Sequence, residues 1–331
     1  MIRFLNTMFV DKLDPDIFKN ENDKNYRLAV ALDKKKIENF FTEEGFRIIN
    51  VCQIFRNMHG KLKKSGKVYF FKLASTKDIS ERTYNEMVWN NEINKVITKN
   101  DVDYFSVPKT IYSGYFEDKF YYITEFFDGQ AIATKNPINV GSLHKWLDKI
   151  IETNLFFLNL KDHLSLPRDD SEYEGKVNFF LEFYNQDLKL LQNLKEFSLN
   201  EVLSIEEILK ESYKAALNHG DFVPWHMIDN VVNFILVDGE HGSCKLPKYF
   251  DIVYLYTRIY TALELPDLAK KYINLIRTNI PSAEKEFFDL SIKPLVANRI
   301  ISGFWHAKNE SKTNMKYYFE LKRDLLTNQL Y

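Results

Sequence analysis

Residues 217–229, with the sequence LNHGDFVPWHMID, collect side chains that can bind, orient and deprotonate a substrate. His219 and His226 offer two imidazoles, Asp221 offers a carboxylate, and a second carboxylate, Asp238, ends the next β-type run. One carboxylate of such a pair can orient or deprotonate a hydroxyl group, while the other binds a hard cation such as Mg²⁺. The stretch therefore predicts a catalytic loop followed by a cation ligand.

Two short β-type stretches must bring these carboxylates together. HMIDN and VNFILVDG flank a turn at Asp229–Asn230, and their pairing carries Asp221 and Asp238 to one face. Gly220 allows a close backbone approach, and Pro224 stiffens the loop. The residues before the motif predict a helix, so we expect the loop to lie between a helix and a strand.

The first part of the chain has the texture of a small sheet. A glycine-punctuated basic loop, RNMHGKLKKSG, separates the first two predicted strands, and the hairpin turns at Phe116–Lys119. A helix that ends at Gly45 is predicted over residues 34–45, and two strands over 46–55 and 67–74. A second helix follows over 78–100, and a hairpin over 107–129.

Beyond residue 140 the helical period takes over. Ser204 and Glu207 form a capping box at the start of one predicted helix. The predicted helices cover residues 143–160, 176–194 and 204–217, and further helical segments continue to Tyr331. The sequence thus divides into three regions. Residues 1–45 are an N-terminal extension that contains a helix, residues 46–129 are a sheet lobe, and residues 130–331 are a helical lobe that contains the catalytic loop.

Composition excludes several classes of protein. The net charge of −1 over 331 residues provides no general attraction for nucleic acid or an anionic membrane surface. No window approaches 18 uninterrupted apolar residues, and the start of the chain does not read as a signal peptide, so no membrane span is expected. Cys52 and Cys244 make no disulfide framework, which favours a reducing cytoplasm. The oligomeric state is left open.

The loop resembles that of the aminoglycoside phosphotransferase-like (choline kinase-like) small-molecule kinases, and the likeness extends over roughly residues 45–260. Their signature is a His-Gly-Asp loop, then a proline, then a strand ending in a metal-binding aspartate. His219, Gly220, Asp221, Pro224 and Asp238 match it. The segment KYFDIVYLY fits the next element of the family, where a structural aspartate opens a helix, and Glu240 and Asp251 fit the two further acidic positions.

The resemblance implies a fold and an activity. It implies an α+β, protein-kinase-like, two-lobed fold with a small N-terminal antiparallel-sheet lobe and a larger, mostly helical C-terminal lobe. It also implies an ATP-dependent phosphotransferase that uses Mg²⁺ and phosphorylates a hydroxyl of a small-molecule acceptor, a sugar or an amino alcohol. The acceptor and the choice between ATP and GTP stay open.

The same resemblance implies a role for each site residue. Asp221 and His219 are the catalytic residues, and Asp238 holds the metal ion. Lys72 contacts the α- and β-phosphates and pairs with a helix glutamate, Glu92 by preference or Glu86 as the alternative. Backbone groups from Glu125 to Phe127 meet the adenine. The lysines of HGKLKKSGK form either a solvated turn or a loop that covers the phosphates.

One position departs from the family pattern, since His226 stands where the family has asparagine. Imidazole is a poorer ligand for Mg²⁺ than an amide oxygen and a better one for Mn²⁺ or softer ions. If His226 is a metal ligand, activity falls below about pH 6–6.5 as the imidazole protonates. If it has abandoned the metal, replacing it with asparagine raises magnesium-supported turnover.

Two other classes of function compete with the kinase. A catalytically silent, kinase-like binding module is favoured by the histidine at 226. A metal-dependent hydrolase would use His219, Asp221, His226, Asp238 and His241 as ligands, but the chain lacks a tight HExxH or CxxC pair. Transfer of phosphate from a nucleotide separates the three classes.

Overall fold

A computed structural model describes residues 29–160, 164–170, 214–309 and 314–331. The chain divides into two units, each of which is described by itself. The first unit comprises Met1–Asp101, Val107–Asp128 and Gly239–His241, and the second comprises Val102–Ser106, Gly129–Asp238 and Gly242–Tyr331. No helix among the described residues is long and apolar enough to cross a membrane.

A five-stranded antiparallel sheet forms the centre of the first unit, with the strand order β1-β2-β3-β6-β5. Its strands are β1 (Arg47–Ile54), β2 (Asn57–Lys64), β3 (Lys67–Ala74), β5 (Thr110–Phe116) and β6 (Lys119–Glu125). The hairpin predicted over 107–129 is confirmed as β5 and β6, with its turn between Phe116 and Lys119. The N-terminal antiparallel sheet that we expected is therefore present.

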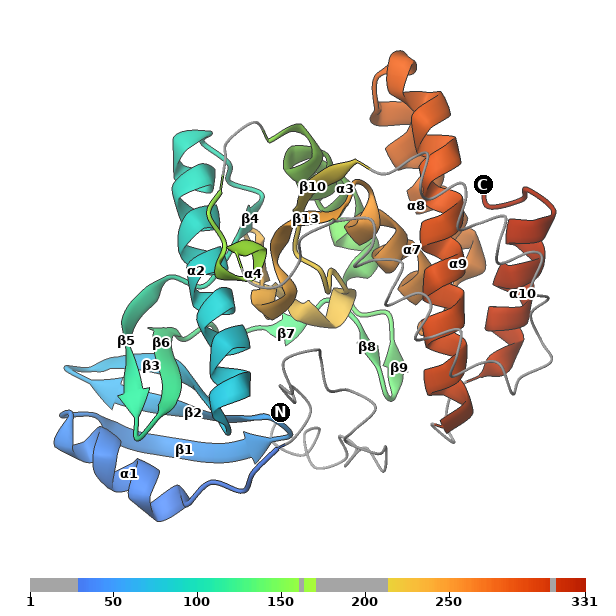
Figure 1. The fold of residues 1–331 in the computed structure, drawn as a ribbon. Coiled ribbons are helices and arrows are strands. Elements are labelled where there is room, and N and C mark those ends of the chain that lie inside the picture. Colours follow the sequence, from blue (N-terminus) through green and yellow to red (C-terminus); the bar gives the residue numbers. More distant parts are fainter. Residues whose placement is uncertain (1–28, 161–163, 171–213, 310–313) are drawn as a thin grey trace. The chain divides into compact units, whose positions relative to one another are not determined.

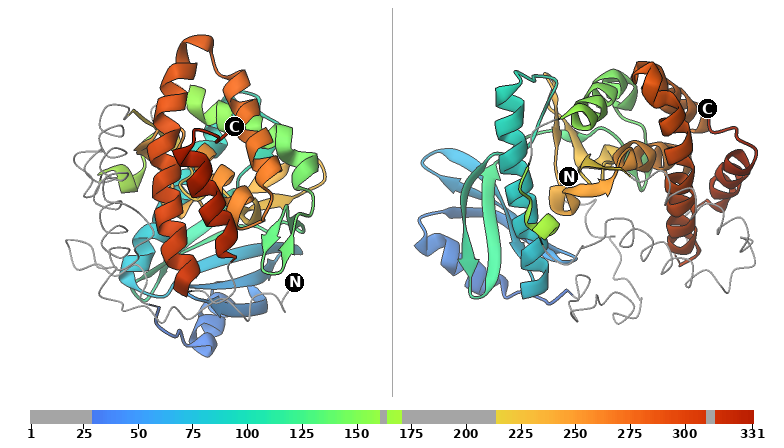
Figure 2. Two further views of the ribbon diagram at one scale, coloured as in Figure 1. Left: turned by 90° about the vertical axis from the view of Figure 1, so that its right-hand side faces the viewer. Right: turned by 45° about the horizontal axis from the view of Figure 1, so that its top comes forward.

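Two helices cover opposite faces of this sheet (Figure 1, Figure 2). They are α1 (Lys34–Glu43) and α2 (Lys77–Lys99), both predicted. On the α1 side Phe41 packs against Phe71, with 4.6 Å between the ring centroids. On the α2 side Met87 packs with Phe120 and Tyr122. Because successive strand residues point to opposite faces, β6 contributes Tyr121 and Ile123 to the α1 side and Phe120 and Tyr122 to the α2 side.

The basic loop predicted between the first two strands is wrong, because most of it forms β2. Met58 and Leu62 are buried on the α1 side, and Gly60 lies between them. A Cβ atom on Gly60 would lie 2.3 Å from a ring carbon of Phe71, so only glycine lets that ring pack there. The true turn is shorter, at Ser65–Gly66, where both residues have positive φ as a tight hairpin requires.

The second unit contains small sheets that shape its loops. A four-stranded sheet has the order β4-β12-β11-β7, and β10 pairs with β13. The strands are β4 (Phe105–Ser106), β7 (Gln130–Ala131), β8 (Thr134–Lys135), β9 (Ile138–Asn139), β10 (Ala215–Asn218), β11 (Met227–Asp229), β12 (Phe234–Leu236) and β13 (Ser243–Pro247). The predicted pairing around Asp229–Asn230 is confirmed by β11 and β12.

Helices make up most of the remaining described residues of the second unit. They are α3 (Leu143–Asn159), α4 (Pro167–Asp170), α7 (Phe250–Thr261), α8 (Pro266–Asn279), α9 (Lys285–Asn309) and α10 (Met315–Leu326). Helix α7 is almost wholly buried and packs against α8, α9 and α10 (Figure 1). The predicted helix over 143–160 is confirmed, and its apolar side is buried at Leu143, Trp146, Leu147, Ile150 and Ile151.

The helices predicted over 176–194 and 204–217, including the capping box at Ser204, fall largely outside the described residues. One part of that prediction is wrong, because Ala215–Asn218 is strand β10. Ala216 pairs with Leu246 of β13, so the ladder of backbone hydrogen bonds replaces a last helical turn. The catalytic-loop motif therefore follows a strand and not the expected helix.

Candidate active site

Lys72 lies in the middle of β3 and points to the side of the sheet that α2 covers. It is directly opposite Tyr122 in the strand register, and Tyr122 packs on α2. The Lys72 ammonium lies 2.6 Å from a Glu86 carboxylate oxygen, and both side chains are buried. A buried ammonium needs such a partner, since removing it from water without one is costly.

The preferred partner of Lys72, Glu92, is not the one that the structure pairs with it. Glu92 instead lies 2.5 Å from Lys95 on the outside of α2. At about 100° per residue, Glu92 is rotated roughly 240° around the helix from Glu86 and so points away from β3. The alternative that we named from the sequence, Glu86, is the observed partner.

A second carboxylate, Glu240, gathers three cations in the first unit. Its oxygens lie 2.7 Å from Arg56 and 3.8 Å from each of Lys72 and Arg82. Burial opposes the charge on Glu240, but Arg56, His241 and Lys72 hold its pKa well below the ordinary value. Glu240 is therefore an anion that neutralises cations from the β1–β2 turn, from β3 and from α2. Sequence reasoning did not identify Arg56.

The backbone beside Glu240 is placed by a glycine. A Cβ atom on Gly239 would lie 2.6 Å from the ring of Trp89, which is fully buried in α2. Asn85 of the same helix donates a hydrogen bond to the Glu240 carbonyl oxygen at 3.2 Å. The sequence Gly239-Glu240 is therefore fitted closely against α2 by packing as well as by charge.

The expected hinge lies at the end of the β5–β6 hairpin. Glu125 is the last residue of β6 and is exposed, whereas Phe127 follows it in an irregular, half-buried segment. The lysine-rich segment has structural partners, because Lys61 lies 3.9 Å above the Phe126 ring and Lys64 lies 4.4 Å above the Phe46 ring. These contacts favour the plain hairpin turn over a loop that covers phosphates.

In the second unit, Asp251 holds the loop that follows β10. Its two carboxylate oxygens accept hydrogen bonds from the backbone N–H groups of His219, at 2.5 Å, and Gly220, at 2.9 Å. Gly220 has φ +81°, a conformation that glycine adopts without strain. The Asp251 backbone N–H in turn donates to Asn218 Oδ1 at 3.1 Å. The first turn of α7 thus fixes the backbone immediately before Asp221.

The His219 imidazole is fully buried and holds the loop from the other side. Its Nε2 lies 3.1 Å from the Val237 carbonyl oxygen, and its Nδ1 accepts a longer contact of 3.4 Å from the Asp221 backbone N–H. Burial lowers the pKa of His219 to about 4, so the ring is neutral at physiological pH. One nitrogen donates and the other accepts, which positions Asp221 and leaves no proton for transfer to a substrate.

Asp221, His226 and Asp238 converge at the end of this loop. Nδ1 of His226 lies 3.1 Å from the Asp221 carbonyl oxygen and 3.5 Å from its carboxylate, while Nε2 lies 3.4 Å from the Asp238 carboxylate. One ligand atom from each residue fits within 4.8 Å of the others. All three side chains are partly exposed. Asp238 has φ +68°, a position that aspartate tolerates better than most residues.

A neutral His226 ring has one N–H and therefore cannot donate to both of its oxygen partners. If Nδ1–H donates to the Asp221 carbonyl, the Nε2 lone pair of a neutral ring faces the Asp238 carboxylate, and two acceptors do not attract. A proton on Nε2 or a metal ion beside both groups removes the conflict. One imidazole nitrogen and two carboxylates suit Mn²⁺ at least as well as Mg²⁺. These residues therefore fit a divalent cation.

The five-ligand set of the rival hydrolase is not brought together. His219 is engaged with the Val237 carbonyl, and His241 lies 3.2 Å from Glu240 in the first unit. Of the five candidates, only Asp221, His226 and Asp238 converge among the described residues.

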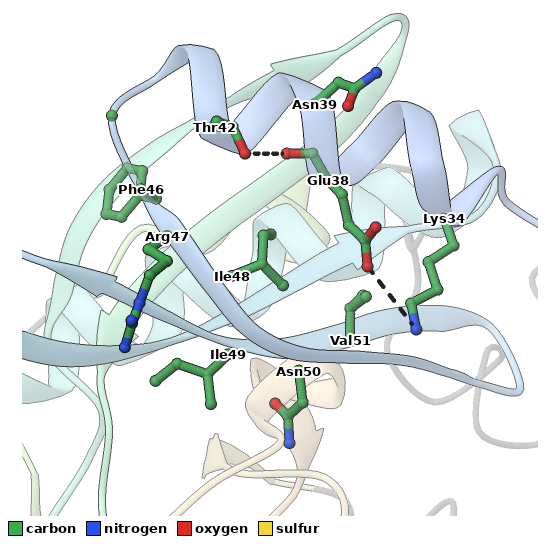
Figure 3. Close-up of a pocket in the computed structure, with 11 residues that line it drawn as sticks. Lys34, Glu38, Asn39, Thr42, Phe46, Arg47, Ile48, Ile49, Asn50 and Val51 are labelled. Carbon is green, nitrogen blue, oxygen red and sulfur yellow. Dashed lines mark hydrogen bonds and ion pairs between the residues drawn. The ribbon is translucent and has the colours of Figure 1, made fainter.

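A separate open depression of about 870 Å³ lies on the first unit between α1 and β1 (Figure 3). Lys34 and Glu38 line it and form an ion pair at 3.8 Å. It contains none of the site residues predicted from the sequence. The depression lies at the edge strand β1, and β2 separates that strand from β3, which carries Lys72.

The chain has the fold of the aminoglycoside phosphotransferases and of choline kinase, a two-lobed kinase-like fold. A ternary complex of aminoglycoside phosphotransferase APH(4)-Ia with ADP and hygromycin B matches with a TM-score of 0.54 and 11% identity, covering 88% of this chain and 97% of that chain. Choline kinase LicA from Streptococcus pneumoniae matches with a TM-score of 0.53 and 13% identity, covering 89% and 99%.

A third solved structure, the GDP complex of aminoglycoside 2'-phosphotransferase-IIIa, matches with a TM-score of 0.53 and 12% identity, covering 89% of this chain and 97% of that chain. No protein-family model matches the sequence, and no curated protein matches it. The expected fold class is thus confirmed, and at these identities the likeness concerns the fold alone.

Proposed function

We propose that this protein is an ATP-dependent phosphotransferase that phosphorylates a hydroxyl group of a small molecule. The observation that carries the proposal is the convergence of Asp221, His226 and Asp238 on a loop that Asp251 holds rigidly. The fold supports it, because proteins of this fold have been solved with ADP and with GDP. Positioned carboxylates and a cation site are what phosphoryl transfer requires.

In this proposal Asp221 is the catalytic residue. Its carboxylate accepts a hydrogen bond from the acceptor hydroxyl and takes the proton as the oxygen attacks the γ-phosphorus. A bond forms between the acceptor oxygen and phosphorus, and the bond from phosphorus to the β-phosphate oxygen breaks, releasing ADP. His219 acts through the loop as a positioning residue, since it is neutral and both ring nitrogens are engaged.

Asp238 and His226 would hold the divalent cation, which neutralises phosphate charge when bound. Lys72 contacts the nucleotide phosphates, and Glu86 orients its ammonium group. Backbone groups from Glu125 to Phe127 receive the nucleotide base. Each of these roles is a proposal that rests on the geometry within one unit together with the fold.

Thermal unfolding with nucleotide tests this function. Millimolar MgATP raises the melting temperature, because a ligand at a hundred times its dissociation constant adds about 2.7 kcal/mol of stability. MnATP and MgGTP are measured in parallel. AMP, which lacks the β- and γ-phosphates, is the control. Absence of a shift with any nucleotide overturns the proposal.

Labelled nucleotide then separates the enzyme from a silent module. Transfer of label from [γ-³²P]ATP to a small acceptor supports the phosphotransferase. Nucleotide binding without transfer to sugars, sugar acids, amino alcohols or aminoglycosides supports the binding module instead. Turnover of a phosphate ester without any nucleotide supports the hydrolase.

A further inference from the structure

One face of helix α7 runs from the catalytic loop to a pair of arginines. Asp251, Tyr254 and Arg258 are spaced i, i+3 and i+7, so their side chains share one face of the helix. Asp251 at the start of this face binds the backbone of His219 and Gly220, next to Asp221. The side chains one and two turns further along therefore continue away from the catalytic carboxylate.

The guanidinium groups of two arginines lie against the Tyr254 ring. Arg258 donates a hydrogen bond to its hydroxyl at 3.2 Å and lies 5.1 Å from its ring centroid. Arg299, from helix α9, lies 4.9 Å from the same ring and 5.4 Å from the ring of Phe250. Arg299 also donates to the Asn298 side-chain oxygen from Nε and Nη2. Tyr254, Arg258 and Arg299 are each partly exposed, so a ligand can reach them.

The charge of Arg258 is not balanced by an adjacent carboxylate. Within the described residues Arg258 forms no ion pair with an acidic side chain, whereas Arg277 of α8 forms two hydrogen bonds of 2.7 Å with Asp289. Burial opposes the charge on Arg258, yet Tyr254, Tyr318 and the more distant Asp221 raise its pKa. A half-buried guanidinium of this kind has donors left for a planar anion.

We propose that Arg258 and Arg299 bind an anionic group of the acceptor, so that the substrate is a small hydroxylated acid and not an amine. The shared chemistry is a carboxylate or a phosphate on a polyhydroxy compound, such as a sugar acid or a sugar phosphate. The anion lies against Arg258 and Arg299 while a hydroxyl of the same molecule meets Asp221. The inference rests on the proposed phosphotransferase function and names its class of acceptor.

Arginine is suited to this task by its geometry. Its planar fork donates two parallel hydrogen bonds to a carboxylate or phosphate, and stacking on Tyr254 and Phe250 limits the rotamers that binding must fix. A cationic acceptor would instead bring like charges together beside Arg258, and their repulsion weakens its binding. The same surface thus selects one class of acceptor and rejects the other.

Four hexoses with one skeleton and different charges test the proposal. Glucuronate, glucose 6-phosphate, glucose and glucosamine are titrated to about 10 mM into the full chain without nucleotide, and the melting temperature is followed. We expect glucuronate, glucose 6-phosphate or both to stabilise the protein, with no effect of glucose or glucosamine. The first two arms distinguish a carboxylate from a phosphate.

Variants then locate the effect. Arg258→Gln and Arg299→Gln are each expected to weaken binding of the stabilising anion about tenfold or more. Arg323→Gln, at an exposed arginine of α10, is the matched control and leaves that affinity unchanged. Arg258→Glu is expected to reverse the preference in favour of glucosamine. If it does not fold, the two glutamine variants still decide the question.

Each remaining outcome overturns the inference. It is wrong if neither anion stabilises the wild type, if glucose or glucosamine does so equally well, or if the effect survives in both glutamine variants. If the anion still stabilises both glutamine variants, the two arginines do not bind it and act only through their charge on Asp221. Because these titrations omit nucleotide, failure of the kinase function appears separately, as absence of the MgATP shift.

Discussion

The two units of the chain each hold a cluster of charged side chains, and the clusters differ in how they are neutralised. In the first unit Lys72, Glu86 and Glu240 have side chains only 6%, 4% and 3% exposed. In the second unit Asp221 and Asp238 are 25% and 33% exposed. A buried cluster must balance its charges internally, because burying a lone charge costs several kcal/mol. A partly exposed cluster can keep excess negative charge, since water supports it.

This difference indicates a division of labour. The buried cluster is rigid and pre-arranged, with Arg56, Arg82 and Lys72 already oriented around Glu240. The open cluster is acid-rich and carries one histidine, so it can exchange protons and cations with solvent. Chemistry is expected at the cluster that solvent reaches, and stability at the buried one.

The largest effect is expected from removing the carboxylate at the centre of the open cluster. Asp221→Asn should lower turnover by about 10²–10⁴-fold, because an amide cannot accept the proton of the acceptor hydroxyl. MgATP affinity should stay nearly intact, whereas Asp238→Asn should weaken MgATP binding itself. Steady-state kinetics and calorimetric titration of MgATP measure both. Equal behaviour of the two variants would contradict the assignment of roles.

The next effect concerns the stability of the buried cluster. Glu86→Gln should lower the free energy of unfolding by about 3 kcal/mol, because it removes the carboxylate charge that lies 2.6 Å from the buried Lys72 ammonium, whereas Glu240 lies farther away, at 3.8 Å. Glu92→Gln is the matched control on the same helix and should change it by less than about 0.5 kcal/mol, since its pair with Lys95 is exposed. Urea unfolding measures both, and similar losses would remove the distinction between the two glutamates.

A third effect lies in the pH dependence of stability, where a buried histidine of the catalytic loop and a buried aspartate of α7 oppose each other. Burial lowers the pKa of His219 from 6.5 to about 4 and raises that of Asp251 from 3.8 to about 7. As pH falls from about 6.5 to 4, the unfolded chain gains a proton at His219 that the folded chain refuses, which destabilises the fold. Over the same range the folded chain gains one at Asp251, which stabilises it.

Asp251→Asn removes only the second of these contributions. The variant should therefore lose more stability than the wild type between pH 6.5 and 4, by up to about 3 kcal/mol at about 1.4 kcal/mol for each unit of pKa shift. Its lost hydrogen bond lowers stability at every pH and does not change the slope. Urea unfolding at a series of pH values measures the difference, and parallel curves would show that Asp251 does not titrate in this range.

The smallest effect sharpens the role of His226 in the open cluster. As a metal ligand it should make Mn²⁺ the better cofactor, and His226→Asn should shift the preference toward Mg²⁺ by about tenfold. His226→Ala should lose turnover with both ions. Turnover is compared for the three proteins with each metal from about pH 5.5 to 8. If His226→Ala matches the wild type under every condition, His226 binds no metal.

The sequence predicted the elements whose apolar pattern is simple. The stripe on 143–160 and the continuous apolar run of β6 both mark surfaces that the fold removes from water. Strand β2 was missed because its inward positions are Met58, Gly60 and Leu62, and the central one has no side chain to mark the face. The other face of β2 carries lysines, so the segment looks like a basic loop and its alternation of inward and outward residues is not evident from the sequence.

The candidate site divides in the same way. The spacing of Asp221 and Asp238 predicted a shared site because a short hairpin allows few arrangements of its ends. The preferred partner of Lys72, Glu92, was wrong because α2 buries polar residues such as Asn85, Glu86 and Asn90 together with its apolar ones. Its stripe therefore does not show which glutamate faces the sheet. Arg56 has no local motif, and only the tertiary fold brings it to Glu240.

Helix α7 has a consequence for how proteins of this fold can diversify. Its first turn fixes the loop through Asp251, while recognition of the acceptor is proposed for Arg258, seven residues later. A substitution of Arg258 would change which acceptors bind. It would leave the hydrogen bonds from Asp251 to the loop backbone in place. Holding the loop and binding the acceptor are assigned to different turns of the same helix. Single mutations can therefore change the acceptor during evolution while the arrangement of the catalytic loop is kept.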